Sequence, residues 1–526
     1  MSAAATHIDP VAYARRWKTL AVLSLALVVI GLDNTVLNVA LPSLQEHFHA
    51  SAATLQWMVD SYLLVFAGLL LTTGALGDRF GRKKALLAGT AIFGGASLAV
   101  LAVDGAGELI AVRAIMGLGA ALIMPATLSI ITNIFPREER GKAIGVWAGM
   151  AAVGIGFGPL LGGALLNWFS WTSVFLINVP IAAAAFALSW RYVSESRDPK
   201  PGAFDLPGSG LSTAALVALV YAIIEAPSKG WGNPVILGAL GVAVVFGIAF
   251  AAWELRNREP LIDLSYLRNP RFSVAALALS LASFALFGAI FALTLYMQFA
   301  HGYSALQAGA AMVPIAFGLV IGAGSSSMVV QRFGTTNVVA FGLLGFGVLL
   351  GTGLAWTPSM PYWPLGIWLF MTAVAMGLVM GPATESVMGA VPEAKAGVAS
   401  AMNDVTRQVA GALGVAVIGS LISSFYASSV RDGLPALSEP ARKTVEDSVG
   451  SAHALAATLP ADTGAQVVHA ANSAFTYAMG IGFAVAAVFA VVAAVIVKRW
   501  LPAGHLPVPG TRPAAVKPIA AGARAR

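Results

Sequence analysis

Residues 28–42 read VVIGLDNTVLNVALP, an apolar run with a single carboxylate, Asp33, inside it. The run belongs to a longer apolar segment, residues 19–41, which is long enough to cross a bilayer as a helix. A charged side chain at bilayer depth costs at least about 2.5–3.5 kcal/mol on insertion scales, so it is kept only where it has a partner or a function. The stretch therefore predicts a membrane protein with a functional carboxylate in its interior.

The composition of the whole chain indicates a polytopic membrane protein and excludes a soluble fold. Its 526 residues are 58% hydrophobic and 10% charged, whereas a soluble domain carries about 25% charged residues. Mean hydropathy is +0.80. The first 18 residues are polar and lead directly into a full-length apolar segment, so we expect no cleavable signal. We place the protein in the cell membrane, with lipid as its surroundings.

The absence of several sequence motifs limits the kinds of chemistry that the protein can perform. There is no cysteine, which excludes disulfides, thiol chemistry and cysteine metal sites. No GxxxxGK[ST] string occurs, so the chain has no ATP-binding P-loop. The net charge of +7 fits membrane topology better than a nucleic-acid partner, because Lys and Arg gather in cytoplasmic loops. We therefore expect no enzyme activity, no metal and no cofactor, and a gradient such as that of protons as the energy source.

Fourteen segments are long and apolar enough to be membrane spans. If the N-terminus is cytoplasmic, most of the 31 Lys and Arg fall in segments on the inside, which also places the C-terminus in the cytoplasm. This charge bias does not separate fourteen spans from twelve. The predicted spans are 19–41, 54–76, 85–103, 108–133, 141–166, 173–193, 208–225, 233–253, 272–300, 305–330, 336–356, 362–390, 397–425 and 473–497.

A short internal repeat organises these spans. The tripeptide RFG follows the second span at residues 79–81 and the tenth span at residues 332–334. Two six-span bundles with an inserted pair of spans explain this spacing, as in duplicated transporter folds. The predicted fold class is thus an all-α polytopic membrane protein. The expected divisions are a cytoplasmic N-terminus (1–18), a first bundle (19–193), a linker with two extra spans (194–271), a second bundle (272–497) with an outside loop (426–472), and a disordered basic tail (498–526).

The loop after the second span carries a recognisable string, GALGDRFGRKK, at residues 74–84. Its glycines allow a tight turn, Asp78 can cap a helix or pair with an arginine, and the basic cluster anchors the turn at the cytoplasmic surface. An ordinary positively charged loop is the alternative. The string resembles the loop signature of the major facilitator superfamily, which implies a charge-linked latch between two halves. The matching residues are Gly74, Gly77, Asp78, Arg79, Gly81, Arg82 and Lys83, with Asp78 and Arg82 as the key members.

The fifth span contains GIGFGPLLGG at residues 154–163. Glycines every four residues make one smooth helix face, and a proline kinks the helix because it lacks an N–H. Generic close packing of helices is the alternative explanation. The string resembles the antiporter signature of drug/proton exchangers in the same superfamily, which implies export. Its residues are Gly154, Gly158, Pro159, Gly162 and Gly163.

Three further strings resemble the fourteen-span drug/proton antiporter branch, the EmrB/QacA-type multidrug exporters. They are LDNTVLNVALP at 32–42, VFLINVP at 174–180 and RAIMGLGAA at 113–121. The resemblance implies that Arg113, in the third string, takes part in proton coupling. That signature commonly has glutamine where this chain has Met116, which removes a polar neighbour from Arg113.

Three charges lie at a similar predicted depth in the first bundle. Counting from the span ends places Asp33, Asp60 and Arg113 in its outer half. We expect Arg113 to neutralise one aspartate and to leave the other able to exchange a proton, the set titrating as a coupled group.

The second bundle has its own candidate cluster, made of Glu385, Asp404 and Arg407. Asp404 and Arg407 are three residues apart on one span and can pair. A static ion pair between neighbouring spans is one interpretation, and a second acidic site for protons or a cationic substrate is the other.

These features predict a secondary exporter that takes lipophilic, often cationic, compounds out in exchange for protons. The expected mechanism is alternating access, by rocking of two halves around a central site. One alternative is a dedicated exporter of a single metabolite or self-made antibiotic. The other is a membrane scaffold or receptor without transport. The sequence gives neither the substrate nor the oligomeric state.

Overall fold

The computed structural model describes residues 10–197, 205–257, 266, 268–391 and 396–502. These residues form helices joined by short connections, and no strand occurs among them. The helices are α1 (Pro10–Phe48), α2 (Ala52–Phe80), α3 (Arg82–Ala99), α4 (Ala106–Ile134), α5 (Arg137–Trp168), α6 (Ser173–Leu176), α7 (Asn178–Tyr192), α8 (Leu206–Lys229), α9 (Pro234–Arg256), α10 (Pro270–Leu295), α11 (Ala305–Ala311), α12 (Val313–Phe333), α13 (Thr335–Gly351), α14 (Tyr362–Met388), α15 (Ala396–Val430), α16 (Glu439–Asp447), α17 (Val449–Ala456) and α18 (Ala461–Trp500).

The prediction of an all-α polytopic membrane protein is confirmed. In the described part of the chain, 13 helical segments are long and apolar enough to cross a membrane. The remaining predicted span, 141–166, lies on α5, a helix of 32 residues in which some side chains fall outside the described part. The count of fourteen spans and the cytoplasmic position of both termini therefore stay predictions. The predicted tail lies beyond the described residues from position 503 onward.

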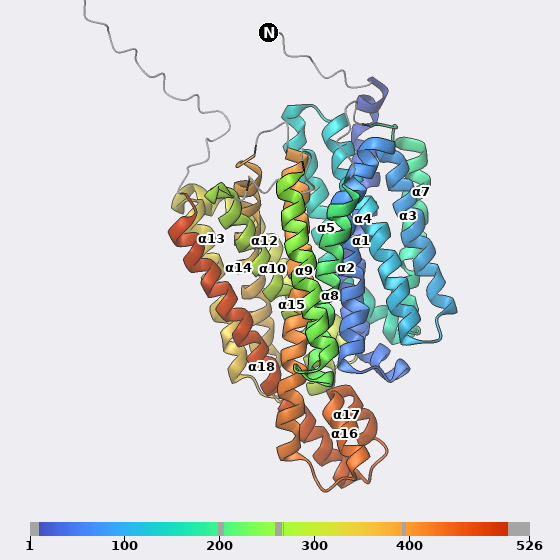
Figure 1. Ribbon diagram of the computed structural model, residues 1–526, viewed down its shortest axis with the longest axis vertical. Coiled ribbons are helices and arrows are strands. Elements are labelled where there is room, and N and C mark those ends of the chain that lie inside the picture. The colour runs from blue at the N-terminus through green and yellow to red at the C-terminus, as the bar shows by residue number, and fades with distance from the viewer. Residues whose placement is uncertain (1–9, 198–204, 258–265, 267, 392–395, 503–526) are drawn as a thin grey trace, which may run out of the picture.

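Two helical bundles stand side by side (Figure 1). In the first half, α1 packs on α5, α2 on α4, and α3 on α4 and α7. In the second half, α12 packs on α14, α10 on α15 and α13 on α18. One predicted span, 305–330, is broken into α11 and α12, because Pro314 at the start of α12 has no N–H to continue the helical ladder.

The RFG repeat marks the same turn in both halves. Gly81 follows α2 with φ of 125°, and Gly334 follows α12 with φ of 79°. Each donates its N–H to the carbonyl four residues earlier, Gly77 at 2.9 Å and Val330 at 2.8 Å. Only glycine adopts such φ values without strain, so the repeated tripeptide reports a duplicated helix–turn–helix.

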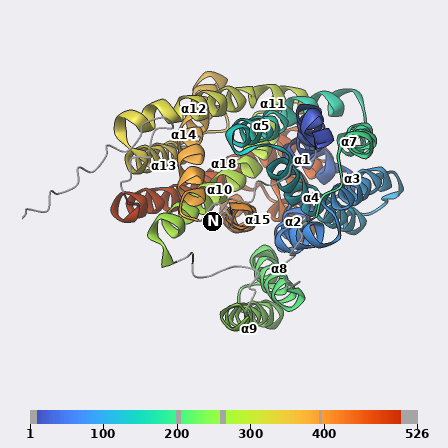
Figure 2. The same cartoon turned by 90° about the horizontal axis from the view of Figure 1, so that it is seen from above.

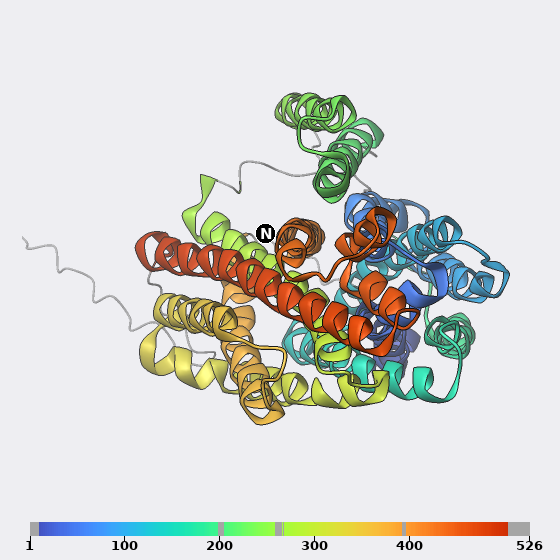
Figure 3. The same cartoon turned by 90° about the horizontal axis from the view of Figure 1, so that it is seen from below.

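The inserted pair, α8 and α9, lies outside the two bundles beside α2 and α15 (Figures 2 and 3). Asp205 holds the hairpin together at its open end. Its carboxylate accepts from the Gly208 N–H at 2.9 Å, from Trp253 Nε1 at 2.8 Å and from Asn257 Nδ2 at 3.0 Å.

Polar bonds join α8 to the first half. Thr72 donates to Ser209 at 2.6 Å, Thr213 donates to the Gly68 carbonyl at 3.3 Å, and Trp57 Nε1 donates to Glu225 at 3.1 Å. These bonds involve residues 57 to 72 of α2 and residues 209 to 225 of α8, so α8 is joined to the first half over most of its own length.

The two halves meet closely at the end of the bundles that lies away from the chain termini, called here the distal end. Gln298 Nε2 in the second half donates to the Val39 carbonyl in the first at 2.8 Å. Gln45 Nε2, near the end of α1, donates to Ser448 Oγ at 2.6 Å. Within the described residues, these are the two hydrogen bonds between the halves, and both lie at the distal end. On the predicted topology the structure is therefore closed toward the outside.

This closure can be tested by cross-linking, because the chain has no cysteine of its own. The double variant Gln45→Cys/Ser448→Cys is expected to cross-link in high yield with a short bifunctional thiol reagent, since the two side chains touch in this state. Yield is measured by the shift on a gel after cleavage of an engineered site between the two positions. Low yield, with each single cysteine still reactive, would contradict a closed distal end.

Candidate functional site

An ion pair between α1 and α4 lies in the interior of the first half. Arg113 Nη1 donates to Asp33 Oδ2 at 2.5 Å, and each residue is 1% exposed. The pairing of Arg113 with one aspartate agrees with the arrangement expected from the sequence. Because both partners are buried, their charges interact strongly and must be matched.

Groups from two more helices complete the surroundings of the pair. Asn178 Nδ2, at the start of α7, donates to Asp33 Oδ1 at 3.1 Å. Arg113 Nε donates to the Met58 carbonyl at 3.1 Å, and its guanidinium lies 4.4 Å from the centre of the Tyr62 ring. Arg113 thus has its partners although Met116 offers no polar side chain.

Asn178 was not predicted as a site residue. It stands inside the VFLINVP string, which was noted for its resemblance alone. An asparagine in an otherwise apolar stretch was the available signal.

Asp60 is fully buried on α2 but does not join this pair. Both of its carboxylate oxygens lack a hydrogen-bond partner among the described residues. Tyr62, which faces Arg113, is two residues away, and two residues correspond to about 200° around a helix. Gln56, one turn before Asp60 and on its face, packs against Gly419 of α15. Asp60 is therefore directed away from Arg113, toward the second half.

The signature loop is held by contacts within the first half. Arg82 Nε pairs with Asp78 Oδ1 at 2.7 Å. The loop is also bound to the segment after α7, because Glu195 accepts from the Lys83 N–H at 3.2 Å and Ser196 accepts from the Arg82 N–H at 2.9 Å. Glu195 was missed by sequence reasoning, since nothing in the sequence joins it to a loop more than a hundred residues earlier.

Other residues of the loop signature have local roles in this structure. Gly74 lies against Pro125, and Gly77 against Ala85. The Arg79 guanidinium lies 5.7 Å from the Phe80 ring centre. A latch between the two halves, which the resemblance implies, stays a prediction.

The glycines of α5 serve two different contacts. Gly154, Gly158 and Gly162 face α1, where a Cβ would meet the backbone or side chains of residues 28–36. Gly163 faces the other half, since a Cβ there would lie 2.7 Å from Leu306 Cα and closer still to the Ala305 carbonyl. Gly309 of α11 lies in turn against the Pro159 carbonyl. The signature thus packs α5 on α1 and also brings α5 against the second half.

The cluster predicted in the second half lies on α14 and α15. Glu385 is exposed, and Asp404 and Arg407 are partly buried on α15. Asp404 and Arg407 lie close enough to interact electrostatically, although no direct ion pair joins them within the described residues, so both interpretations of the cluster stay predictions. Two residues three positions apart on a helix can form an ion pair but need not do so. The Arg407 Nε atom has no hydrogen-bond acceptor in the described part of the chain.

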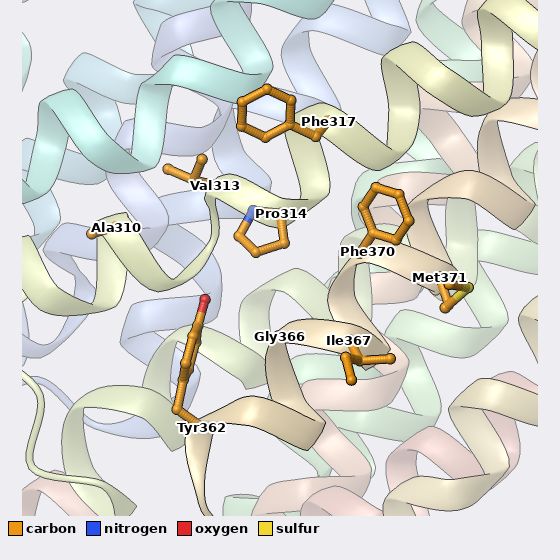
Figure 4. Close-up of a pocket in the computed structure, with 9 residues that line it drawn as sticks. All are labelled: Ala310, Val313, Pro314, Phe317, Tyr362, Gly366, Ile367, Phe370 and Met371. Atoms are coloured by element: carbon orange, nitrogen blue, oxygen red, sulfur yellow. The ribbon is translucent and has the colours of Figure 1, made fainter.

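A groove of about 540 Å³ lies on the outer face of the second half (Figure 4). It runs between α11–α12 and α14, and aromatic and aliphatic side chains line it, Phe317 being 62% exposed. No charged residue lines it. The groove therefore belongs to the apolar surface of the bundle, apart from the buried charges. Among the described residues, no group of three or more His, Asp or Glu is placed to hold a metal ion.

The structure thus has two helical bundles, with a buried ion pair inside the first. A family model described as the Major Facilitator Superfamily matches residues 23–415. The chain belongs to this superfamily, whose members are multi-pass membrane transporters and not enzymes.

Several curated proteins are similar to the chain over most of its length. The tetracenomycin C resistance and export protein of Streptomyces glaucescens is 33% identical, over 92% of this chain and 91% of its own. The multidrug efflux pump LfrA of Mycolicibacterium smegmatis is 34% identical, over 92% and 96%. The methyl viologen resistance protein SmvA of Salmonella typhimurium is 34% identical, over 88% and 94%.

A solved structure is similar in fold. It is a bacterial homolog of the human lysosomal transporter Spinster, with a TM-score of 0.64 and 20% identity over 92% of this chain and 96% of that one. The likeness supports the two-bundle architecture.

Because the charges of Asp33 and Arg113 match, we expect a single and a double variant of the pair to differ in their free energy of unfolding. Asp33→Asn leaves a buried, unpaired guanidinium and is expected to lower the free energy of unfolding by about 3–5 kcal/mol. The double variant Asp33→Asn/Arg113→Gln removes both charges and is expected to recover most of that loss. Thermal unfolding of purified protein in detergent measures both, with Asp432→Asn, an exposed acid, as the control. Equal melting temperatures for the single and double variants would contradict the pair.

Proposed function

We propose that the protein is a secondary active exporter that moves lipophilic, mainly cationic, compounds out of the cell in exchange for protons. The observation that carries the proposal is Asp60, a fully buried acid whose carboxylate oxygens have no hydrogen-bond partner among the described residues. An unpaired charge is costly in such surroundings, so the carboxylate needs either a proton or a cation.

The neighbouring ion pair explains why Asp60 stands alone. Arg113 is already neutralised by Asp33 and is directed to the other face of α2. Asp60 therefore has no cation of its own to lose when it exchanges a proton for a substrate. The pair joins α1, α4 and α7 to one another, which supports a separate role for Asp60 in exchange.

In the proposed cycle, Asp60 gives up its proton to the cytoplasm and attracts a cationic compound from that side. Rocking of the halves then exposes the site to the outside, where a proton displaces the compound. One proton exchanged for one monovalent cation moves no net charge, so the pH difference alone drives that exchange. A second proton would add about 2.3 kcal/mol per 100 mV of membrane potential.

The names of the relatives favour export, but they differ in the range of compounds that they indicate. LfrA is named a multidrug efflux pump, and SmvA a methyl viologen resistance protein. Others are named for a single antibiotic, tetracenomycin C or methylenomycin A. Those names favour a second candidate, a dedicated exporter of one compound with the same proton site. Competition between chemically unrelated substrates separates the two.

Transport by Asp60→Asn vesicles tests the proposal. Wild-type vesicles with an imposed pH gradient are expected to transport a cationic dye, and a proton uncoupler is expected to stop them. Asp60→Asn is expected to abolish this gradient-driven transport, because the amide cannot exchange a proton at neutral pH. Exchange of the cationic dye without a gradient is expected to fall as well, because the amide offers no negative charge to bind a cation.

Asp462→Asn, which changes an exposed acid, is the matched control and is expected to behave as wild type. Gradient-driven transport of normal rate in Asp60→Asn would overturn the role given to this acid. Dye transport in wild type that no uncoupler affects would overturn proton exchange altogether.

A further inference from the structure

The loop between α15 and α18 forms a cap over the distal end, made of α16 and α17 (Figure 1). Contacts within the second half hold it in place. Tyr426 donates to the Val445 carbonyl at 2.9 Å, and His453 Nε2 is hydrogen-bonded to Asn472 Oδ1 at 2.8 Å. The Gln45–Ser448 bond then joins the cap to the first half. The cap therefore forms part of the boundary between the two halves.

A small cavity of about 30 Å³ lies beneath this cap, with walls from both halves. A water molecule needs at least about 10–15 Å³ of such volume and two to four polar partners. The cavity meets both conditions, because polar side chains contribute to its wall. They are Gln45, Gln56, Ser423, Tyr426, Asp447 and Ser448.

Two glutamines of the first half have free acceptors at this place. The Oε1 atoms of Gln45 and Gln56 are buried and have no hydrogen-bond partner in the described part of the chain. Gln56 is 1% exposed and Gln45 is 4% exposed. Each amide oxygen needs a donor, and water inside the cavity would supply one.

Gln56 connects the cavity with the unpaired acid. It precedes Asp60 by one turn of α2, so the two side chains lie on the same helix face. Side chains on a helix lean toward its N-terminus, which tilts the Asp60 carboxylate back toward Gln56 and the cavity. Both residues carry buried oxygen atoms that have no hydrogen-bond partner among the described residues. Gln56 lines the cavity, and Asp60 follows it one turn further along α2.

Asp447 connects the same cavity with the outside. It is exposed at the end of α16 and also lines the cavity. Its carboxylate accepts from Ser451 Oγ at 3.4 Å. Of the charged groups near it, Glu446 is paired with Arg431 and Arg442, and Lys443 is exposed on the same helix. From α15, the Tyr426 hydroxyl is engaged with the Val445 carbonyl. No ion pair therefore neutralises Asp447 within the described residues.

We propose that protons from outside reach Asp60 through the cavity beneath the cap, from Asp447 at its mouth by way of water held at Gln45 and Gln56. This route rests on the proposed proton exchange and adds where the proton is taken up. No covalent bond is made or broken apart from the O–H bonds along the route. A proton leaves Asp447, passes over water and ends on the Asp60 carboxylate.

The test compares two modes of transport in the same vesicles. Gln56→Leu keeps the size of the side chain and removes its amide. It is expected to slow dye transport driven by protons from the distal side by about tenfold or more, since positioned proton transfer contributes at least that much. Exchange of dye without a gradient, which requires no net proton movement, is expected to stay within about twofold of wild type.

Two further variants sharpen the comparison. Gln56→Asn keeps an amide at the cavity and is expected to restore most of the proton-driven rate. Asp447→Asn is expected to lower that rate, whereas Asp432→Asn, which changes an exposed acid of the same loop, is expected to leave it unchanged.

Each other outcome overturns the route. A normal proton-driven rate in Gln56→Leu would mean that protons reach Asp60 by another path. Equal loss of both modes would make Gln56 a packing residue of the α2–α15 contact. Failure of the proposed function is distinct, because wild-type vesicles would then show no proton-driven transport at all.

Discussion

The buried ion pair between Asp33 and Arg113 determines how the first half is built. It joins α1 to α4, and its remaining bonds reach the Met58 carbonyl of α2 and Asn178 of α7. In a bilayer, a charge pair of this kind is stable only when its hydrogen bonds are nearly complete. Four helices are thereby held at fixed distances around one point. Asp60 is left outside this arrangement, and its carboxylate oxygens have no hydrogen-bond partner among the described residues.

Close backbone contact complements the charges. Glycines on α5 let it approach α1 within the first half, and Gly163 and Gly309 let α5 and α11 touch across the boundary. In a bilayer the hydrophobic effect does not drive helices together, because lipid tails are as apolar as the helix surfaces. Small residues allow close packing between helices, and this packing stabilises their association instead. The contacts across the boundary gather at the distal end, together with Gln45 and the cap. A motion that opened this end would have to separate α2 from α15 and α5 from α11, as well as break the two hydrogen bonds between the halves.

The sequence predicted the features that depend on composition and local spacing. The apolar segments predicted the helices. The RFG repeat predicted the duplication, because glycine is needed at the positive φ of both turns. The pairing of Arg113 with an aspartate followed from depth. Depth could not distinguish the faces of α2, however, so Asp60 was expected beside Arg113 and lies on the other side. Long-range partners had no signal in the sequence. Asn178, Glu195 and the Gln45–Ser448 bond, whose residues are 403 positions apart, needed the folded chain. For Asp404 and Arg407, the helical spacing indicated that the two residues can interact, but it could not give the geometry of their contact.

The central claim is that Asp60 exchanges a proton for a cationic compound. Proton release on binding tests it most directly, with purified protein in weakly buffered detergent solution and a pH-sensitive dye. The account predicts release of about one proton for each monovalent cation bound by the wild type, because the carboxylate must lose its proton to bind the cation. It predicts no release by Asp60→Asn. Equal proton release by both proteins would contradict it.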